Sequence, residues 1–93
     1  MNRKRDFENN PNLEANSSSG KDHTLILHND DIHDFNYVIN SLVEICDHDL
    51  VQAEQCTYLV HYRGECEIKT GKYQKLKGFY DKLIEKGLTV SIN

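Results

Sequence analysis

The chain has 93 residues, enough for one small domain, because a single hydrophobic core becomes marginal below this size. Hydrophobic residues make up 38% of the chain, and no apolar run approaches the roughly 18 residues that a membrane helix needs, so we expect no membrane segment. The formal net charge of −4 is uneven, with nine acids against one arginine in residues 23–67 and six lysines against two acids in residues 68–93. An acidic half disfavours nucleic acid and favours cationic ligands, although solvated faces without a partner would give the same pattern.

Residues 1–22 predict a flexible N-terminal extension. They are rich in Asn, Ser, Glu and Lys, and their apolar residues occur only singly, so they cannot form a core. Their basic start runs into acidic residues and asparagines where a signal peptide would have its apolar segment, so we expect a cytoplasmic protein. The folded domain is then expected over residues 23–93.

The first half of this domain predicts a strand followed by two helices. Residues 24–28 are a short β-branched and aliphatic run that ends in a polar turn, as a buried strand does. Apolar residues at helical spacing predict a helix over about residues 34–46, capped by Asp34 or His33. A second helix is predicted from Leu50 to near Tyr62, behind a loose capping box of Asp49 and Gln52.

The second half predicts a strand, a helix and a strand. Residues 65–69 alternate in polarity as a half-exposed strand, and the Thr70-Gly71 pair is expected to open a helix over about residues 71–86. Gly87 suits the end of that helix, and residues 88–92 alternate as a last strand. The order β-α-α-β-α-β predicts an α+β two-layer sandwich, in which a three-stranded sheet packs against three helices.

The densest polar cluster covers residues 28–33 (HNDDIH), at the turn between the first strand and the first helix. One interpretation is structural, because Asn and Asp close turns and cap helices. A second is a metal site, since two His and two Asp can ligate zinc, although adjacent side chains of an extended turn diverge. A third is an amine site, because the oxygens of Asn29, Asp30 and Asp31 can accept charge-assisted hydrogen bonds from an ammonium group.

Other candidate residues favour a binding protein over an enzyme. His61 follows an apolar stretch, where it is either a core-edge histidine or a ligand residue. The odd set Cys46, Cys56 and Cys66 has no CxxC spacing, which argues against a disulfide framework and a zinc finger and favours small core residues. The sequence has neither a Gly-x-Ser-x-Gly motif nor a glycine-rich phosphate loop. We therefore expect no enzymatic activity, no metal and no cofactor.

Four motifs together resemble the ClpS family of bacterial adaptors. They are LILHNDD at residues 25–31, FNYVINSL at 35–42, AEQ at 53–55 and VHYxG at 60–64, in matching order and spacing. The resemblance spans about residues 24–93. It implies an adaptor that binds N-degron proteins, which carry a free α-amino group and a bulky hydrophobic first residue, and delivers them to a ClpA- or ClpC-like AAA+ unfoldase, with no nucleic acid or membrane as partner.

The resemblance also implies which residues form the site. The α-amino group would be held by Asn29, Asp30 or Asp31, together with His61. The first side chain would enter a pocket between the first two helices, lined by Ile32, His33, Phe35, Thr57, Val60 and Leu88. An α-amino group, with a reference pKa of about 7.7–8.0, is mostly protonated at pH 7, so an acceptor-rich rim selects it over internal amides. In this family the N-terminal extension engages the unfoldase.

The chain departs from the family pattern at two positions. Thr57 stands where the family has a bulky Met guarding the pocket, and His33-Asp34 replaces a Thr-Pro pair at the start of the first helix. One alternative is therefore a ClpS-like modulator of the unfoldase that does not bind N-degrons. The other, from a different class, is a metal-binding protein that uses the cluster of residues 28–33.

Overall fold

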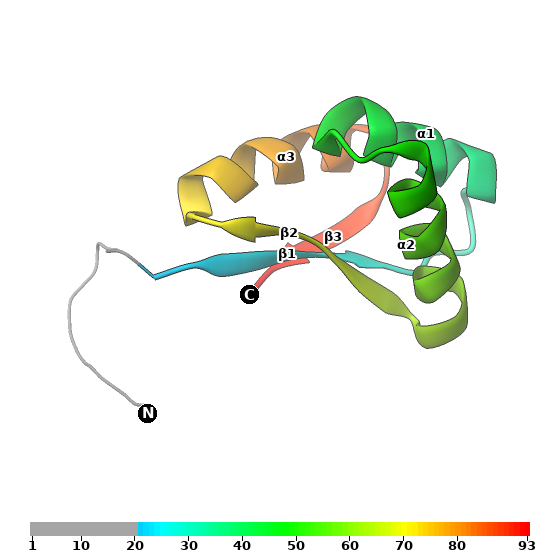
Figure 1. Cartoon of the computed structure of the whole chain (residues 1–93), viewed down its shortest axis with the longest axis horizontal. Helices are drawn as coiled ribbons and strands as arrows, with labels where there is room; N and C mark the ends of the chain where they lie inside the picture. Colours follow the sequence, from blue (N-terminus) through cyan, green and yellow to red (C-terminus); the bar gives the residue numbers. More distant parts are fainter. Residues whose placement is uncertain (1–20) are drawn as a thin grey trace.

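The computed structural model describes residues 21–93 and contains all six expected elements in the expected order (Figure 1). The extension expected over residues 1–22 lies, apart from Lys21 and Asp22, outside the described residues. Within residues 21–93, no helix is long and apolar enough to cross a membrane. The elements are β1 His23–His28, α1 Phe35–Cys46, α2 Leu50–Arg63, β2 Glu65–Gly71, α3 Tyr73–Glu85 and β3 Thr89–Ile92.

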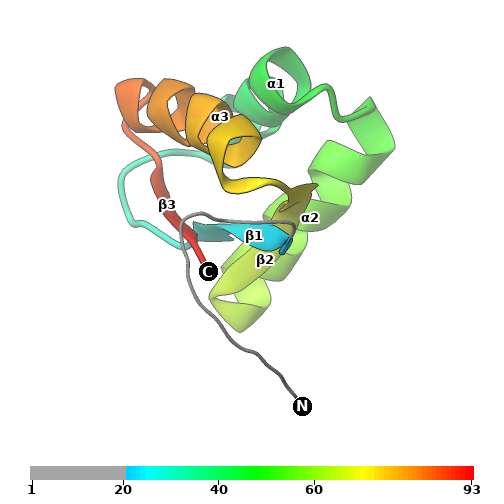
Figure 2. The same cartoon turned by 90° about the vertical axis from the view of Figure 1, so that its left-hand side faces the viewer.

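The sheet has the order β2-β1-β3, with β1 antiparallel to both neighbours. Figures 1 and 2 show α1 and α3 over one face of the sheet and α2 descending along its side, next to β2. The α+β sandwich of a three-stranded sheet and three helices is thereby confirmed. Because β1 is the central strand, its C-terminal end lies between both neighbours, and the turn that follows it is held at one end of the sheet.

A β-bulge interrupts the pairing of β1 with β2. The register shifts between Leu25 and Ile26, so that Ile68 is the extra residue on β2. The carbonyl of Ile68 accepts a hydrogen bond of 3.0 Å from Nε2 of His48, in the turn between α1 and α2. Since a carbonyl only accepts, Nε2 of His48 must carry the proton. This contact ties the helical turn to the bulged strand.

The core forms where the apolar stripes of the three helices meet the inward residues of the sheet. Among the described residues it comprises Leu25, Leu27, Ile39, Leu42, Cys46, Ala53, Cys56, Val60, Ile68, Leu76, Leu83, Leu88 and Val90. Cys46 and Cys56 are buried as expected, and Cys66 is half-buried. Burial raises the pKa of the Cys46 thiol to about 11, so it is protonated at neutral pH.

Capping explains where the first two helices begin. The side chain of Asp34 accepts the Tyr37 N–H at 2.9 Å, and that of Asp49 accepts the Gln52 N–H at 2.8 Å. Both caps were predicted from the sequence, and of the two candidates for α1, Asp34 and His33, the cap is Asp34. Each oxygen satisfies one N–H group that has no partner within its own helix.

The predicted start of the third helix at residue 71 is wrong. Thr70 and Gly71 pair with Thr24 and His23 and extend β2, so α3 begins only at Tyr73. The glycine adopts a φ of 159°, outside the helical region, which ends the strand rather than opening the helix. Ladder hydrogen bonds to β1 thus outweigh the local preference of these two residues.

Candidate functional site

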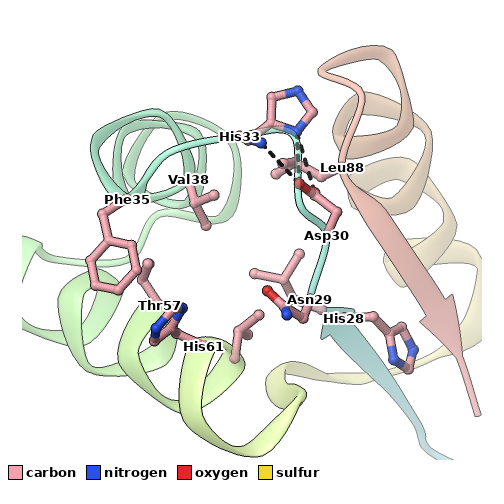
Figure 3. A pocket seen from close by; sticks show the side chains of 11 residues that line it. His28, Asn29, Asp30, His33, Phe35, Val38, Thr57, His61 and Leu88 are labelled. Atoms are coloured by element: carbon pink, nitrogen blue, oxygen red, sulfur yellow. Dashed lines mark hydrogen bonds and ion pairs between the residues drawn. The ribbon is translucent and has the colours of Figure 1, made fainter.

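A small cavity opens where the β1–α1 turn, α2 and the residue before β3 meet (Figure 3). Its volume is about 60 Å³, and it is open to solvent on one side. The lining residues come from three separate parts of the chain. They are Leu27, His28, Asn29, Asp30, His33, Phe35, Val38, Thr57, Val60, His61 and Leu88.

The inner wall of the cavity is apolar. Phe35 and Val38 reach it from the first turn of α1, Thr57 and Val60 from α2, and Leu88 from the segment that enters β3 (Figure 3). The hydroxyl of Thr57 donates to the Ala53 carbonyl at 2.8 Å within α2, so its proton is not available to a ligand. This wall is suited to an apolar side chain, which it can shield from water.

Asp30 organises the polar side of the cavity. Its Oδ1 accepts the backbone N–H groups of Ile32 and His33, each at 2.9 Å, which closes the turn. Nδ1 of His33 lies 3.2 Å from Oδ2. Burial disfavours the ionised carboxylate, but these hydrogen bonds and the nearby imidazole outweigh it and hold the pKa of Asp30 below its ordinary value of 3.8. Asp30 therefore carries a negative charge at the cavity at neutral pH.

His33 is held in place by the start of α1 and the turn after α3. Its ring stacks on Tyr37 at a centroid distance of 4.6 Å, and the Tyr37 hydroxyl donates to the Lys86 carbonyl at 2.6 Å. A Cβ atom at Gly87 would lie only 3.2 Å from the His33 ring. The ring thus packs directly against the glycine turn that leads into Leu88, and the polar and apolar walls are fixed relative to each other.

Asn29 and His61 face the open part of the cavity. Figure 3 shows the side-chain amide of Asn29 directed toward the side on which His61 lies. The backbone N–H of Asn29 donates to the Gly64 carbonyl at 3.0 Å, which ties the end of β1 to the end of α2. Within residues 21–93, neither the Asn29 amide nor the His61 ring nitrogens have a hydrogen-bond partner. Both groups can therefore accept hydrogen bonds from a ligand.

The two histidines that bound the polar cluster point to different partners. Nε2 of His28 lies 2.7 Å from the Ser91 hydroxyl and its Nδ1 lies 3.8 Å from a carboxylate oxygen of Glu65, whereas His33 pairs with Asp30. No group of three or more His, Cys, Asp or Glu side chains that could hold a metal occurs in the part of the chain that the structure describes.

Most of the predicted site residues meet at this cavity. Those that line it are Asn29, Asp30, His33, Phe35, Thr57, Val60, His61 and Leu88. Asp31 and Ile32 are not among the lining residues, and the Ile32 side chain is 83% exposed. Because the Ile32 N–H turns toward Asp30, the turn directs this side chain outward.

Sequence reasoning missed three lining residues, Leu27, His28 and Val38. Val38 lies three residues after Phe35, a spacing that puts both side chains on one face of α1. This spacing could have indicated that Val38 also lines the pocket. Leu27 and His28 directly precede the polar turn, and only the closeness of α2 to the end of β1 makes them part of the wall.

Comparison with protein families identifies the chain. Residues 18–91 match the family model described as ATP-dependent Clp protease adaptor protein ClpS. The chain belongs to the ClpS family. A search of curated proteins found no match. Membership in the ClpS family assigns the chain the role of an adaptor for a Clp protease. Such an adaptor interacts with a Clp AAA+ unfoldase and is not itself the protease.

Proposed function

We propose that this adaptor binds N-degron substrates at the cavity and delivers them to a ClpA- or ClpC-like unfoldase in the cytoplasm. The observation that carries the proposal is the pair Asn29 and His61, two acceptors that have no hydrogen-bond partner within residues 21–93 and lie at the mouth of a cavity with an apolar wall. A free α-amino group followed by a bulky apolar side chain has the complementary arrangement, because one end donates hydrogen bonds and the other avoids water.

The α-amino group would be recognised by three acceptors of different kinds. An ammonium group has three N–H donors, and the Asn29 carbonyl oxygen, an unprotonated nitrogen of His61 and the Asp30 carboxylate can each accept one. The Asp30 Oδ1 already accepts two backbone N–H groups, while Oδ2 is contacted only by His33 and has room for another donor. In this arrangement Asp30 both shapes the turn and supplies the charge that complements the substrate.

The apolar wall would select the first side chain. Full burial of a Leu or Phe side chain contributes roughly 1.5–3 kcal/mol, enough to favour bulky apolar residues over small ones by about tenfold or more. Phe35 contributes the largest lining side chain, and Thr57 is small, so together they define the volume of the wall. A charged first residue would be disfavoured, because the apolar side chains of Phe35, Val38 and Val60 cannot replace the water that its charge would lose.

The direct test is a binding titration with a Leu-initiated peptide, free or acetylated at its amino group. We expect acetylation to abolish measurable binding, and His61→Ala and Asn29→Ala to weaken the free peptide by about 1.5–3 kcal/mol each, the usual value of a hydrogen bond to a charged group. His23→Ala is the matched control, because His23 lies at the far end of β1 and contacts Asn93 and Tyr73 instead of the cavity. Equal affinity for the free and acetylated peptides would contradict amine recognition.

The same titration distinguishes the modulator alternative. A chain that binds the unfoldase but none of the Leu-, Phe-, Tyr- or Trp-initiated peptides would be a modulator without N-degron binding. Removal of residues 1–22 then tests delivery: we expect peptide affinity to persist and degradation of a Leu-initiated protein by the unfoldase and its protease to fail. Full-rate degradation with the truncated chain would contradict a role of this segment in delivery.

A further inference from the structure

Four aromatic rings form a continuous surface beside the cavity, called here the aromatic rim and made of Phe35, Tyr58, His61 and Tyr62. The Phe35 ring meets Tyr58 and His61 edge to face, each at a centroid distance of 5.2 Å. Tyr62 contacts His61 at 4.9 Å and stacks parallel to Tyr58 at 6.2 Å. Two of these residues, Phe35 and His61, line the cavity itself, so the rim begins inside the site and continues onto the surface of α2.

The outer half of the rim is exposed to solvent. Tyr58 is 51% exposed and Tyr62 is 75% exposed, and the adjacent Leu59 is also exposed. Exposed apolar residues that are contiguous mark interaction surfaces more often than isolated ones. The opposite side of the cavity is different, because Asp30 and His33 pair with each other there and the exposed Tyr37 ring is already stacked on His33.

The spacing of the rings indicates which residue of a peptide would reach them. In an extended peptide the first and third side chains lie on the same side, about 6.6–6.8 Å apart, while the second points away. The ring of Tyr58 lies 5.2 Å beyond Phe35 and that of Tyr62 lies 4.9 Å beyond His61. A first side chain inside the cavity therefore directs the third, not the second, back toward the protein surface, and a peptide that leaves the cavity along α2 brings this third side chain over the outer rings.

The chemistry of the rim defines the preferred side chain. Ring faces carry partial negative charge, so they attract aromatic edges and cations and repel carboxylates. Residues 23–67, which contain the rim, carry nine acids against one arginine, and this net charge acts in the same direction, whereas Arg63, next to Tyr62, acts against it. An aromatic or arginine side chain suits the surface, and an aspartate or glutamate does not.

We propose that the aromatic rim is a second subsite that selects the third residue of the bound peptide, favouring aromatic residues and arginine over acidic ones. The inference rests on the proposed function, because it takes the first side chain to occupy the cavity. Tyr58 and Tyr62 are its specificity-determining residues, and Phe35 and His61 connect them to the first subsite.

The test is a titration of the full chain with Leu-Ala-Phe, Leu-Ala-Arg, Leu-Ala-Ala and Leu-Ala-Asp peptides that share one C-terminal sequence, and with Leu-Phe-Ala to vary the second position. We expect Leu-Ala-Phe and Leu-Ala-Arg to bind about two- to tenfold more tightly than Leu-Ala-Asp, as single aromatic and cation–π contacts allow. Tyr58→Ala and Tyr62→Ala should each reduce this ratio toward one, whereas Tyr58→Phe should retain it. Tyr73→Ala is the matched control, since Tyr73 is a similarly exposed tyrosine on α3.

Each outcome decides the inference. A ratio reduced by the two alanine variants and retained in Tyr58→Phe and Tyr73→Ala supports it. A ratio near one in the unmodified chain, a preference at the second position only, or a preference that survives both alanine variants overturns it while leaving the proposed function intact. Failure of every Leu-initiated peptide to bind overturns both, and is distinguished by the absence of any measurable affinity.

Discussion

Replacing Gly87 by alanine should destabilise the domain, because two features of its position require glycine. Its φ is +85°, a left-handed conformation that costs an L-residue about 1–2 kcal/mol. Alanine also lowers the conformational entropy of the unfolded chain, which by itself raises the free energy of unfolding by about 0.4–1 kcal/mol. The added Cβ would lie 3.2 Å from the His33 ring, so that the ring must shift by a few tenths of an ångström. We expect the free energy of unfolding to fall by about 1 kcal/mol, the difference between these terms with the contact included.

Gly78→Ala is the matched control, since the same substitution should have the opposite sign. Gly78 lies within α3 and has no atom within 4 Å of a Cβ at its position. An exposed helical glycine is less favourable than alanine by roughly 0.5–1 kcal/mol, so this variant should be more stable. Urea unfolding followed by circular dichroism measures both, and each 1 kcal/mol corresponds to about 4–8 °C in Tm for a domain of this size. Two variants that shift in the same direction would refute the reasoning from local conformation.

Three further predictions concern the core, the thiols and the turn. Leu76→Ala, at a fully buried position, should lower the free energy of unfolding by about 2–5 kcal/mol, whereas Leu50→Ala, 59% exposed, should change it by less than about 0.5 kcal/mol; urea titrations compare the two. Iodoacetamide should alkylate Cys66 first in the native protein, and mass spectrometry should find the two buried cysteines modified only after unfolding. Because the pKa of Asp30 is lowered on folding, its ionised form stabilises the fold above its ordinary pKa of 3.8, and this contribution is lost as the pH falls through the folded pKa. Below about pH 4, the free energy of unfolding should therefore fall less steeply with decreasing pH in Asp30→Asn than in the unmodified protein. Equal slopes would contradict the assigned hydrogen bonds.

The elements could be predicted from the sequence because their apolar residues recur at regular spacing. Leu76 and Leu83 lie two turns apart on one face of α3, and both are fully buried. The exception is the junction of β2 and α3, where Thr70 and Gly71 belong to the strand. Their assignment depends on pairing with β1, which lies almost fifty residues earlier in the chain, and local propensity does not contain that information.

The candidate site was predicted in composition more completely than in geometry. Polar residues in a turn after a buried strand indicated one side of the site, and the resemblance to the ClpS family supplied the pocket between the first two helices. The pairing of Asp30 with His33 was not foreseen, and neither was the contact between His33 and Gly87, because each depends on the direction of individual side chains. Ile32 shows the same limit: the resemblance implied that it lines the pocket, but the backbone of the turn directs its side chain outward.

The three-part construction of the cavity has a consequence for folding. Its walls come from the β1–α1 turn, from α2 and from Leu88, so they coexist only when nearly the whole described domain is folded. A ligand that binds only the folded state raises the free energy of unfolding of that state, by about 2.7 kcal/mol when its free concentration is 100 times Kd. A loaded adaptor would therefore spend less time unfolded than an empty one, and the substrate it carries would stabilise it beside an enzyme that unfolds proteins.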